Sequence, residues 1–166
     1  MAPFVMAIKI TNNTDSDLKP LGTEIYNGYG DVQQQPDTIL ARSNGSGGVL
    51  EKVIGSDGLF GLVAYSTPDP NQTLVIWTTM PATAGTKNHC WVGLVQSSTN
   101  INQNLAKSCY NGPPGFTESK FTWEFSQSGD KFALVVSADV ADIDAWETYT
   151  TVKLELYHSG SKVSAS

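Results

Sequence analysis

The chemistry that this sequence offers most readily is recognition by aromatic rings set among hydroxyl and amide groups. Eight aromatic residues lie among Asn, Gly, Pro and Thr: Tyr26, Tyr29, Trp77, Trp91, Tyr110, Phe116, Phe121 and Trp123. Such rings can hold a quaternary ammonium by cation–π attraction, or they can stack on a sugar. Trp77 and Trp91 are flanked by aliphatic residues, which favours a place in the core. Tyr29, Tyr110 and Phe116 lie in or beside Gly/Pro turns, where binding and packing both remain open.

Signatures of catalysis and of metal binding are weak. The histidines, His89 and His158, lack the second histidine and the acidic spacing of a zinc site. Because His89 and Cys90 are adjacent, they face opposite ways on a strand, which disfavours a Cys–His dyad. Four acidic residues lie close together in the sequence: Asp139, Asp142, Asp144 and Glu147. They lack the pattern of a calcium-binding loop, so we interpret this stretch as a solvent-exposed connection. We therefore expect a protein that is not an enzyme and that has no cofactor and no metal.

The composition excludes two kinds of interaction. Only 16% of the 166 residues are charged, against roughly 25% in average soluble domains. The formal net charge is -6, and Arg42 is the single arginine. Nucleic-acid binding needs a basic stripe that neutralises phosphates, so we expect no nucleic-acid partner. The same shortage of basic residues excludes a polybasic membrane anchor.

The elements that must position the aromatic residues are short strands. Abundant Ser, Thr, Asn, Gln and Gly favour an all-β protein, and β-patterned runs alternate with turns at roughly 8–12-residue spacing. The expected strands are residues 4–11, 22–29, 49–54, 59–65, 73–79, 91–95, 121–125, 131–137 and 148–157. We predict an all-β, two-sheet β-sandwich, with residues 1–158 as a single domain and residues 159–166 as a flexible C-terminal tail.

The same pattern predicts how some of these strands connect. Residues 49–54 and 59–65 are expected to form a hairpin, because a Gly-Ser-Asp-Gly turn separates them. The polar stretch 31–48 is expected to be a loop. The strongly apolar strands 73–79 and 91–95 are expected to be central.

One segment departs from the strand pattern. Residues 100–109 place Ile101, Leu105, Ala106 and Cys109 at helical spacing, and an Asn-Gly-Pro-Pro sequence that terminates helices follows. We therefore predict one short helix near residues 100–109, on a face or an edge of the sandwich.

Neither a membrane-spanning nor a secretory segment is apparent. No run of about 18 apolar residues occurs, and the N-terminus lacks a charged leader with an apolar stretch. We therefore expect a cytoplasmic protein, or one released by an unconventional route. Unpaired buried thiols are favoured for Cys90 and Cys109, although the two can pair. Three sequons begin at Asn12, Asn44 and Asn71 and, without a leader, indicate only surface turns.

Several blocks of the sequence carry a family resemblance. Residues 58–65 are GLFGLVAY, residues 72–81 are QTLVIWTTMP, and residues 91–94, WVGL, follow the loop 82–90. This succession resembles the two central strands and the following loop of the actinoporin-like cytolysin superfamily. The predicted helix and the CYNG sequence at 109–112 are similar to the family's short second helix and its tyrosine-rich end. The resemblance covers about half of the chain. Aegerolysins and fungal fruit-body lectins share the same sandwich architecture.

Actinoporins bind the phosphocholine head of sphingomyelin, so the resemblance implies a head-group pocket. Phe60 falls at the valine of the pocket floor, and Thr79 falls at a phosphate-contacting serine. Pro81 matches the proline of the family's Ser-x-Pro sequence, and Tyr110 matches one of the tyrosines around the choline. Lys87 falls where a choline-contacting tyrosine is expected. A lysine repels a quaternary ammonium, but it can hold a phosphate oxygen or an acidic head group.

The same family resemblance implies positions for five further residues. Tyr29, Trp91 and Phe116 are additional aromatic candidates for the cleft. In the resembling fold, Cys90 and Cys109 lie on the same side of the sandwich.

The sequence leaves two functions open. The first is a membrane-lipid head-group binding protein, which is a cytolysin or toxin or the lipid-binding component of one. Actinoporins carry an amphipathic pore-lining helix ahead of the first strand, whereas here the first strand is expected by about Phe4. Pore formation would therefore need a homo-oligomer that uses another element, or a second pore-forming protein. The alternative is a carbohydrate-binding lectin, in which the same aromatic and polar cleft stacks on a glycan.

Overall fold

The computed structural model describes residues 4–52, 58–81, 87–112, 115–142 and 146–158, so the tail expected at 159–166 lies outside the described residues. The elements in these ranges are β1 (Phe4–Asn13), β2 (Pro20–Ile25), the 3-10 helix η1 (Tyr26–Gly28), β3 (Asp31–Gln34), β4 (Ser43–Lys52), β5 (Leu59–Ser66), β6 (Gln72–Met80), β7 (His89–Gln96), α1 (Gln103–Tyr110), β8 (Lys120–Gln127), β9 (Asp130–Asp142) and β10 (Glu147–His158). Neither helix in these ranges is long and apolar enough to cross a membrane.

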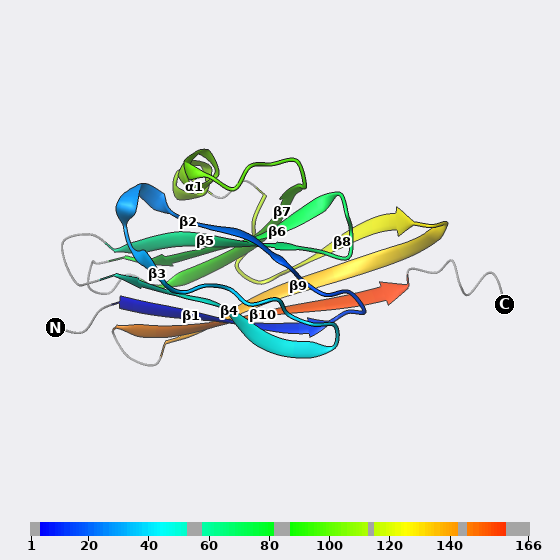
Figure 1. Cartoon of the computed structure of the whole chain (residues 1–166), viewed down its shortest axis with the longest axis horizontal. Helices are drawn as coiled ribbons and strands as arrows, with labels where there is room; N and C mark the ends of the chain where they lie inside the picture. Colours follow the sequence, from blue (N-terminus) through cyan, green and yellow to red (C-terminus); the bar gives the residue numbers. More distant parts are fainter. Residues whose placement is uncertain (1–3, 53–57, 82–86, 113–114, 143–145, 159–166) are drawn as a thin grey trace.

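Two sheets form the layers of a sandwich, and α1 lies on the outer side of the smaller sheet (Figure 1). The larger sheet has the strand order β3-β4-β1-β10-β9-β8, and the smaller sheet has the order β2-β5-β6-β7. β1 and β10 pair in parallel, and the other neighbours are antiparallel. This architecture confirms the predicted all-β, two-sheet sandwich with one short helix.

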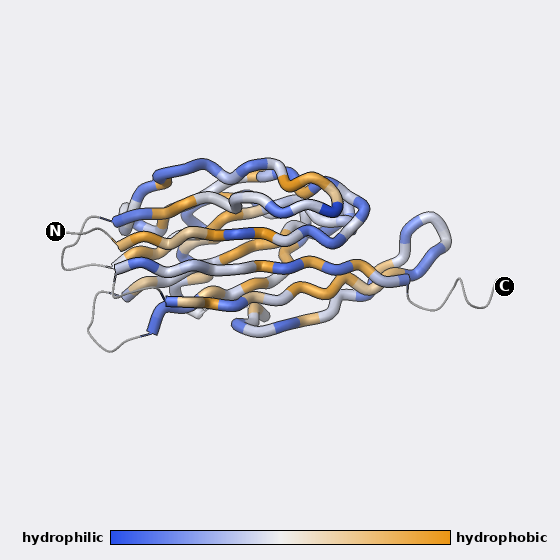
Figure 2. Tube along the Cα trace, turned by 90° about the horizontal axis from the view of Figure 1, so that it is seen from below, coloured by the Kyte–Doolittle hydropathy of each residue, from blue (hydrophilic) through white to orange (hydrophobic). Residues whose placement is uncertain are grey.

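The strands of the larger sheet alternate because their inner faces meet the other sheet. In β1, Ile8 and Ile10 are buried, while Lys9 between them is exposed. β10 repeats the pattern with buried Val152 and exposed Lys153. Figure 2 shows hydrophobic and hydrophilic residues following one another along the strands. The inward side chains form the main core between the two sheets.

The central strands of the smaller sheet, β5 and β6, are buried on both faces, so most of their residues are apolar. On β6, Leu74 and Ile76 belong to the main core, whereas Val75 and Trp77 face outward into a second hydrophobic cluster. The buried side of α1, with Leu105 as its largest buried side chain, closes this second cluster from outside. A continuous apolar run is what burial on both faces of a strand requires.

The expected hairpin between residues 49–54 and 59–65 is wrong. β4 pairs with β1 and β3 in the larger sheet, whereas β5 pairs with β2 and β6 in the smaller sheet. The two strands therefore belong to different layers, and residues 53–57 between them lie outside the described residues. Turn residues alone do not distinguish this arrangement from a hairpin.

The expectation of a loop over residues 31–48 is also wrong, because this stretch contains β3 and the first part of β4. A glycine suits this part of β4 because a neighbouring side chain already fills the space. A Cβ on Gly47 would lie 2.8 Å from Ile8 Cγ2. The glycine allows β4 to approach β1 closely where the register shifts between Ala7 and Lys9.

β6 is central as expected, but β7 is an edge strand of the smaller sheet. Its apolar composition reflects burial on both faces: Cys90 and Val92 belong to the main core, and Trp91 packs against the second cluster. Phe116 lies over Gly93 so closely that a Cβ at this position would collide with the ring. Two-sided burial, and not a central place in the sheet, explains the sequence of β7.

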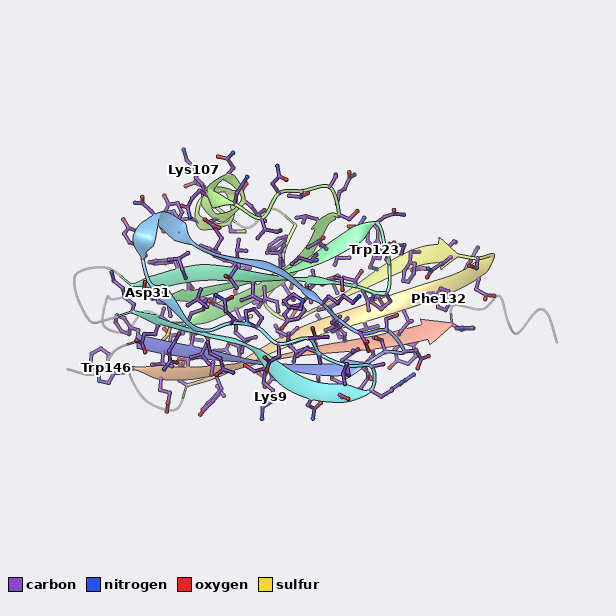
Figure 3. The ribbon with its side chains drawn as sticks, viewed as in Figure 1. Lys9, Asp31, Lys107, Trp123, Phe132 and Trp146 are labelled. Carbon is purple, nitrogen blue, oxygen red and sulfur yellow. The ribbon has the colours of Figure 1, made fainter. Side chains whose placement is uncertain are left out.

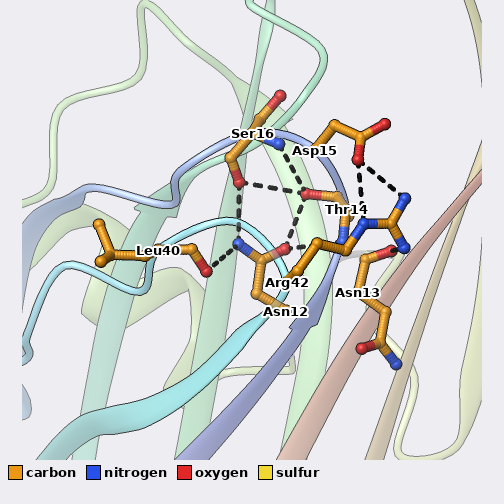
Figure 4. A network of polar contacts seen from close by, with 7 residues as sticks. All are labelled: Asn12, Asn13, Thr14, Asp15, Ser16, Leu40 and Arg42. Carbon is orange, nitrogen blue, oxygen red and sulfur yellow. Dashed lines mark hydrogen bonds and ion pairs between the residues drawn. The ribbon is translucent and has the colours of Figure 1, made fainter.

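Asn12, near the end of β1, is buried, and its side chain joins two segments of the chain (Figure 4). Its oxygen accepts hydrogen bonds from the Thr14 backbone N–H (3.1 Å) and hydroxyl (2.7 Å). Its amide donates to three backbone carbonyls, those of Ser16 (2.8 Å), Ile39 (3.2 Å) and Leu40 (3.1 Å). The expectation that this sequon marks a surface turn is therefore wrong, whereas Asn44 and Asn71 are exposed.

Cys90 and Cys109 are both free and buried, as expected, but the smaller sheet separates them. Cys90 lies in the main core, and Cys109 lies under α1 in the second cluster. The expectation that the two lie on the same side of the sandwich is therefore wrong. Burial raises the pKa of the Cys90 thiol to about 12 and that of the Cys109 thiol to about 11. Both thiols are therefore protonated and unreactive at neutral pH.

Candidate functional site

Most of the residues selected from the sequence lie at one end of the sandwich, which we call the proximal end. It is the end at which β1 begins in Figure 1. Strands β1, β5, β7 and β10 begin there, and β4, β6 and β9 end there. In this register Phe4 pairs with Lys52, and Leu59 pairs with Met80. η1 follows the end of β2 at the same end of the smaller sheet. We call the opposite end the distal end.

A row of three residues crosses the proximal edge of the smaller sheet. Phe60 on β5 pairs with Thr79 on β6, and Thr79 pairs in turn with His89 on β7. Thr79 faces outward, because Trp77 two residues earlier faces the second cluster and strand residues alternate. Pro81 follows β6 directly. The structure therefore brings Phe60, Thr79 and Pro81 together at this edge.

Four rings gather at this row, and we call them the aromatic cluster: Tyr26, Tyr29, Phe60 and Tyr110. Tyr26 and Tyr110 stack, with ring centroids 4.2 Å apart and planes inclined by 16°. Phe60 meets Tyr110 edge-on at 5.2 Å and Tyr29 at 5.8 Å. Tyr26 meets Tyr29 at 5.7 Å, which closes the circuit of contacts. Tyr110 is nevertheless 45% exposed, so the cluster presents an accessible ring.

Polar contacts of α1 hold the cluster in place. Asn102 caps the helix by accepting from two backbone N–H groups of the first turn. The Gln103 side chain donates to the Glu24 carboxylate (2.7 Å) and to the Ile25 carbonyl (2.5 Å). Its oxygen accepts from the Asn27 N–H (2.9 Å), and Asn27 has a positive φ of 48°. Gln103 thus ties α1 to η1, the segment that supplies Tyr26 and Tyr29.

Three of the other aromatic candidates, Trp77, Trp91 and Phe116, belong to or pack against the second cluster. Trp77 is buried in the second cluster, as its aliphatic neighbours suggested. Trp91 and Phe116, which the sequence offered as cleft residues, are partly buried against the same cluster. The Trp91 ring centroid lies 6.0 Å from that of His89. Packing accounts for the placement of both rings, and Phe116 is further fixed by its contact with Gly93.

Lys87 lines a polar cavity between β7 and β9 at the proximal end, with a volume of about 400 Å³. Its polar and charged lining residues are Lys87, Asn88, His89, Glu118, Asp139 and Asp142. The Asn88 amide donates to the Asp142 carboxylate (2.9 Å) and to the Thr148 hydroxyl (2.8 Å), and His89 bonds to Glu118. Within the described ranges, no group of His, Cys, Asp and Glu side chains is placed to hold a metal ion. Asp144 of the acidic stretch lies outside these ranges.

The aromatic cluster offers two kinds of attraction at one place. The faces of its rings attract a cation, and the hydroxyls of Tyr110 and Thr79 can donate hydrogen bonds to phosphate or sugar oxygens. The second cluster lies directly beneath and excludes water from that side. Both attractions are stronger in such partly desolvated surroundings than in bulk water.

Sequence reasoning named Tyr26 among the eight aromatic residues but assigned neither Tyr26 nor His89 to the head-group pocket. Tyr26 stacks on Tyr110, and His89 stands in the row with Thr79. The signal for Tyr26 was the sequence Tyr-Asn-Gly-Tyr, in which two tyrosines flank a turn-forming pair. That pair was assigned to the end of a strand, so the turn that brings both rings together was missed.

No protein-family model matches the chain, and no curated protein matches its sequence. Among solved structures, the fold is similar to the crystal structure of the lipid-binding protein Nakanori. The TM-score is 0.61 at 14% sequence identity, over 92% of this chain and 71% of that chain. The two proteins share a fold. Membership of the actinoporin-like superfamily stays a prediction.

Proposed function

We propose that this protein is a non-enzymatic binding module that recognises the head group of a membrane lipid at the aromatic cluster. The observation that carries the proposal is the circuit of four rings beside Thr79, held by α1 and η1, with Tyr110 open to solvent. The similarity of the fold to that of a lipid-binding protein supports it.

The chemistry of the cluster suits a zwitterionic phosphocholine head group. The open face of the Tyr110 ring, on the side away from Tyr26, attracts the quaternary ammonium, and the Thr79 hydroxyl donates to a phosphate oxygen. Anionic lipids fit less well, because the chain carries a formal net charge of -6 and is repelled by an acidic bilayer. The bound head group is therefore expected to be recognised by aromatic and hydroxyl groups and not by a basic patch.

Co-sedimentation with vesicles tests this proposal. Tyr110→Ala removes a cation–π contact of roughly 0.5–2 kcal/mol, which corresponds to a two- to thirty-fold loss of affinity for sphingomyelin or phosphatidylcholine vesicles. Tyr157→Ala is the matched control, because Tyr157 is an exposed tyrosine at the distal end. Normal binding by Tyr110→Ala, or a loss explained by a lowered melting temperature, contradicts the proposed site.

The finer proposal is that binding serves cytolysis, as in the actinoporin-like family that the sequence resembles. The protein would act either as a homo-oligomer or together with a second pore-forming protein. Release of a trapped dye from sphingomyelin vesicles tests this role directly. Binding without release by the protein alone supports a lipid-binding component, and release by the protein alone supports a complete cytolysin.

The polar cavity favours carbohydrate binding as a second candidate function. Its amide and carboxylate groups, including the bonded pair Asn88 and Asp142, are the groups that commonly hold sugar hydroxyls. A glycan array distinguishes this lectin function from lipid binding. Glycan binding that Asn88→Ala abolishes and Tyr110→Ala leaves intact would place the ligand in the cavity.

A further inference from the structure

We propose that Trp146, supported by Phe4, is a second lipid contact, so that both sheets meet a zwitterionic bilayer through the proximal end. This inference rests on the proposed lipid-binding function and names the surface that would face the membrane. It places one contact on the smaller sheet, at the aromatic cluster, and the other on the larger sheet, at the beginning of β10.

Trp146 is 42% exposed, and a hydrogen bond and a ring contact define its position. Its carbonyl accepts a hydrogen bond from the Val5 N–H at 2.8 Å, which fixes the residue beside the start of β1. Its ring lies 5.4 Å from the ring of Phe4, and Phe4 is buried. The tryptophan is therefore presented at a defined position at the proximal end (Figure 3).

The position of Trp146 matches that of the aromatic cluster along the sandwich. Trp146 precedes β10, whose first residues pair with the first residues of β1. Phe4 pairs with Lys52, the last residue of β4, and Phe60 lies near the start of β5, the next strand along the chain. The two aromatic contacts thus belong to the same end of the molecule, one in each layer.

The chemistry of this end fits a lipid interface with no net charge. Tryptophan and tyrosine concentrate at membrane interfaces because they combine an apolar ring with a polar atom. The nearby charges are of both signs: Lys52 and Glu147 flank the first residues of β1. Together with the net charge of -6, this favours a phosphocholine surface over an acidic one.

Vesicles of phosphatidylcholine with brominated acyl chains test the proposal, because bromine quenches tryptophan fluorescence only on contact. We expect the wild-type protein to be quenched on binding and Trp146→Phe to lose most of that quenching. Trp123→Phe, the matched control, should keep it, because Trp123 lies toward the distal end (Figure 3). Trp146→Phe keeps a ring over Phe4, so this comparison does not depend on a destabilised variant.

The affinities of two variants for vesicles and for soluble phosphocholine test this inference separately from the proposed function. Trp146→Ala should weaken vesicle binding roughly tenfold while leaving the affinity for soluble phosphocholine unchanged, whereas Tyr110→Ala should weaken both. If the wild-type protein binds neither vesicles nor phosphocholine, both proposals fail. If it binds both and Trp146→Phe is quenched like the wild type, the second contact alone is refuted. A change of oligomeric state in Trp146→Ala with normal vesicle binding also overturns it, in favour of a contact between copies of the chain.

Discussion

The outer faces of the two sheets are built differently, although their inner faces share one core. On the larger sheet, Lys9, Thr151 and Lys153 are exposed and the strands alternate. On the smaller sheet, Val75 and Trp77 are buried under α1 and the connection that follows it. The first face is an ordinary solvated sheet surface. The second is a second core, and its proximal rim is where the aromatic cluster lies.

This difference indicates what positions the candidate site. A ring on the exposed outer face of the larger sheet would have fewer neighbours to restrict its rotamer. The rings of Phe60 and Tyr110 instead meet between a sheet and a helix, so packing fixes them before any ligand arrives. Substitutions in the second cluster should therefore change both the stability of the protein and the candidate site. Substitutions on the outer face of the larger sheet should change neither.

Removing the largest side chain of the second cluster should have the greatest effect. Trp77→Ala leaves a cavity between β6 and α1, so we expect a loss of about 3–5 kcal/mol in the free energy of unfolding. Thr151→Ala, on the exposed face of the larger sheet, should change it by less than about 0.5 kcal/mol. Denaturation by urea measures both. Similar losses in the two variants would erase the contrast between the faces.

Overpacking should have an intermediate effect. Gly93→Ala places a Cβ against the Phe116 ring, and we expect a loss of about 1–3 kcal/mol in the free energy of unfolding. Phe116→Ala removes the ring atoms that would clash, so the two substitutions should be non-additive, with Gly93→Ala costing less in the Phe116→Ala background. A double-mutant cycle measured by thermal denaturation decides this. Strict additivity would mean that the two residues do not contact each other.

Cys90 and Cys109 lie on opposite faces of the smaller sheet. Their rates of alkylation therefore compare how well the two faces are buried, without a substitution. Burial raises the pKa of Cys90 to about 12 and that of Cys109 to about 11, from an ordinary value of 9.0. We expect slow alkylation of the folded protein, with Cys109 ahead of Cys90, and rapid labelling of both in denaturant without reductant. Failure to label either thiol in denaturant would indicate a disulfide and contradict their separation by the sheet.

The same shifts predict a dependence of stability on alkaline pH. Both thiol pKa values are higher in the folded protein than in the unfolded chain, so the folded state binds more protons above pH 9. The stability that is present below pH 9 should fall as the pH rises toward about 12. Urea denaturation at increasing pH measures this, and replacement of Cys90 by alanine should flatten the dependence.

The two-layer fold and the short helix could be predicted because strand and helix periodicities are local. The assignment of β4 and β5 to different sheets could not, since a turn gives no information about the layer that the next strand joins. The first part of β4 was expected to be a loop for a similar reason. Gly47 suits a strand only because Ile8 on β1 occupies the space beside it, and the sequence does not show that neighbour. Glycine-rich sequence indicates a loop unless the neighbour is known.

The candidate site, like the fold, could be predicted from the sequence only in part. The family resemblance named Phe60, Thr79 and Pro81. The pairing of β5 with β6, which Pro81 follows directly, accounts for their proximity. Tyr26 enters the site through a turn and Lys87 lies on a separate cavity, and neither placement is encoded in local periodicity. The buried amide of Asn12 has the same origin, because its partners at Ile39 and Leu40 are distant in sequence.

An NMR titration of the wild-type protein with soluble phosphocholine tests the central claim most directly. The claim is that the aromatic cluster is the binding site. We predict saturable shifts at Phe60, Thr79 and Tyr110, with no comparable change at Tyr157 of the distal end. Shifts confined to Asn88 and Asp142 would place the ligand in the polar cavity instead. Either that pattern or the absence of any saturable shift would contradict the account.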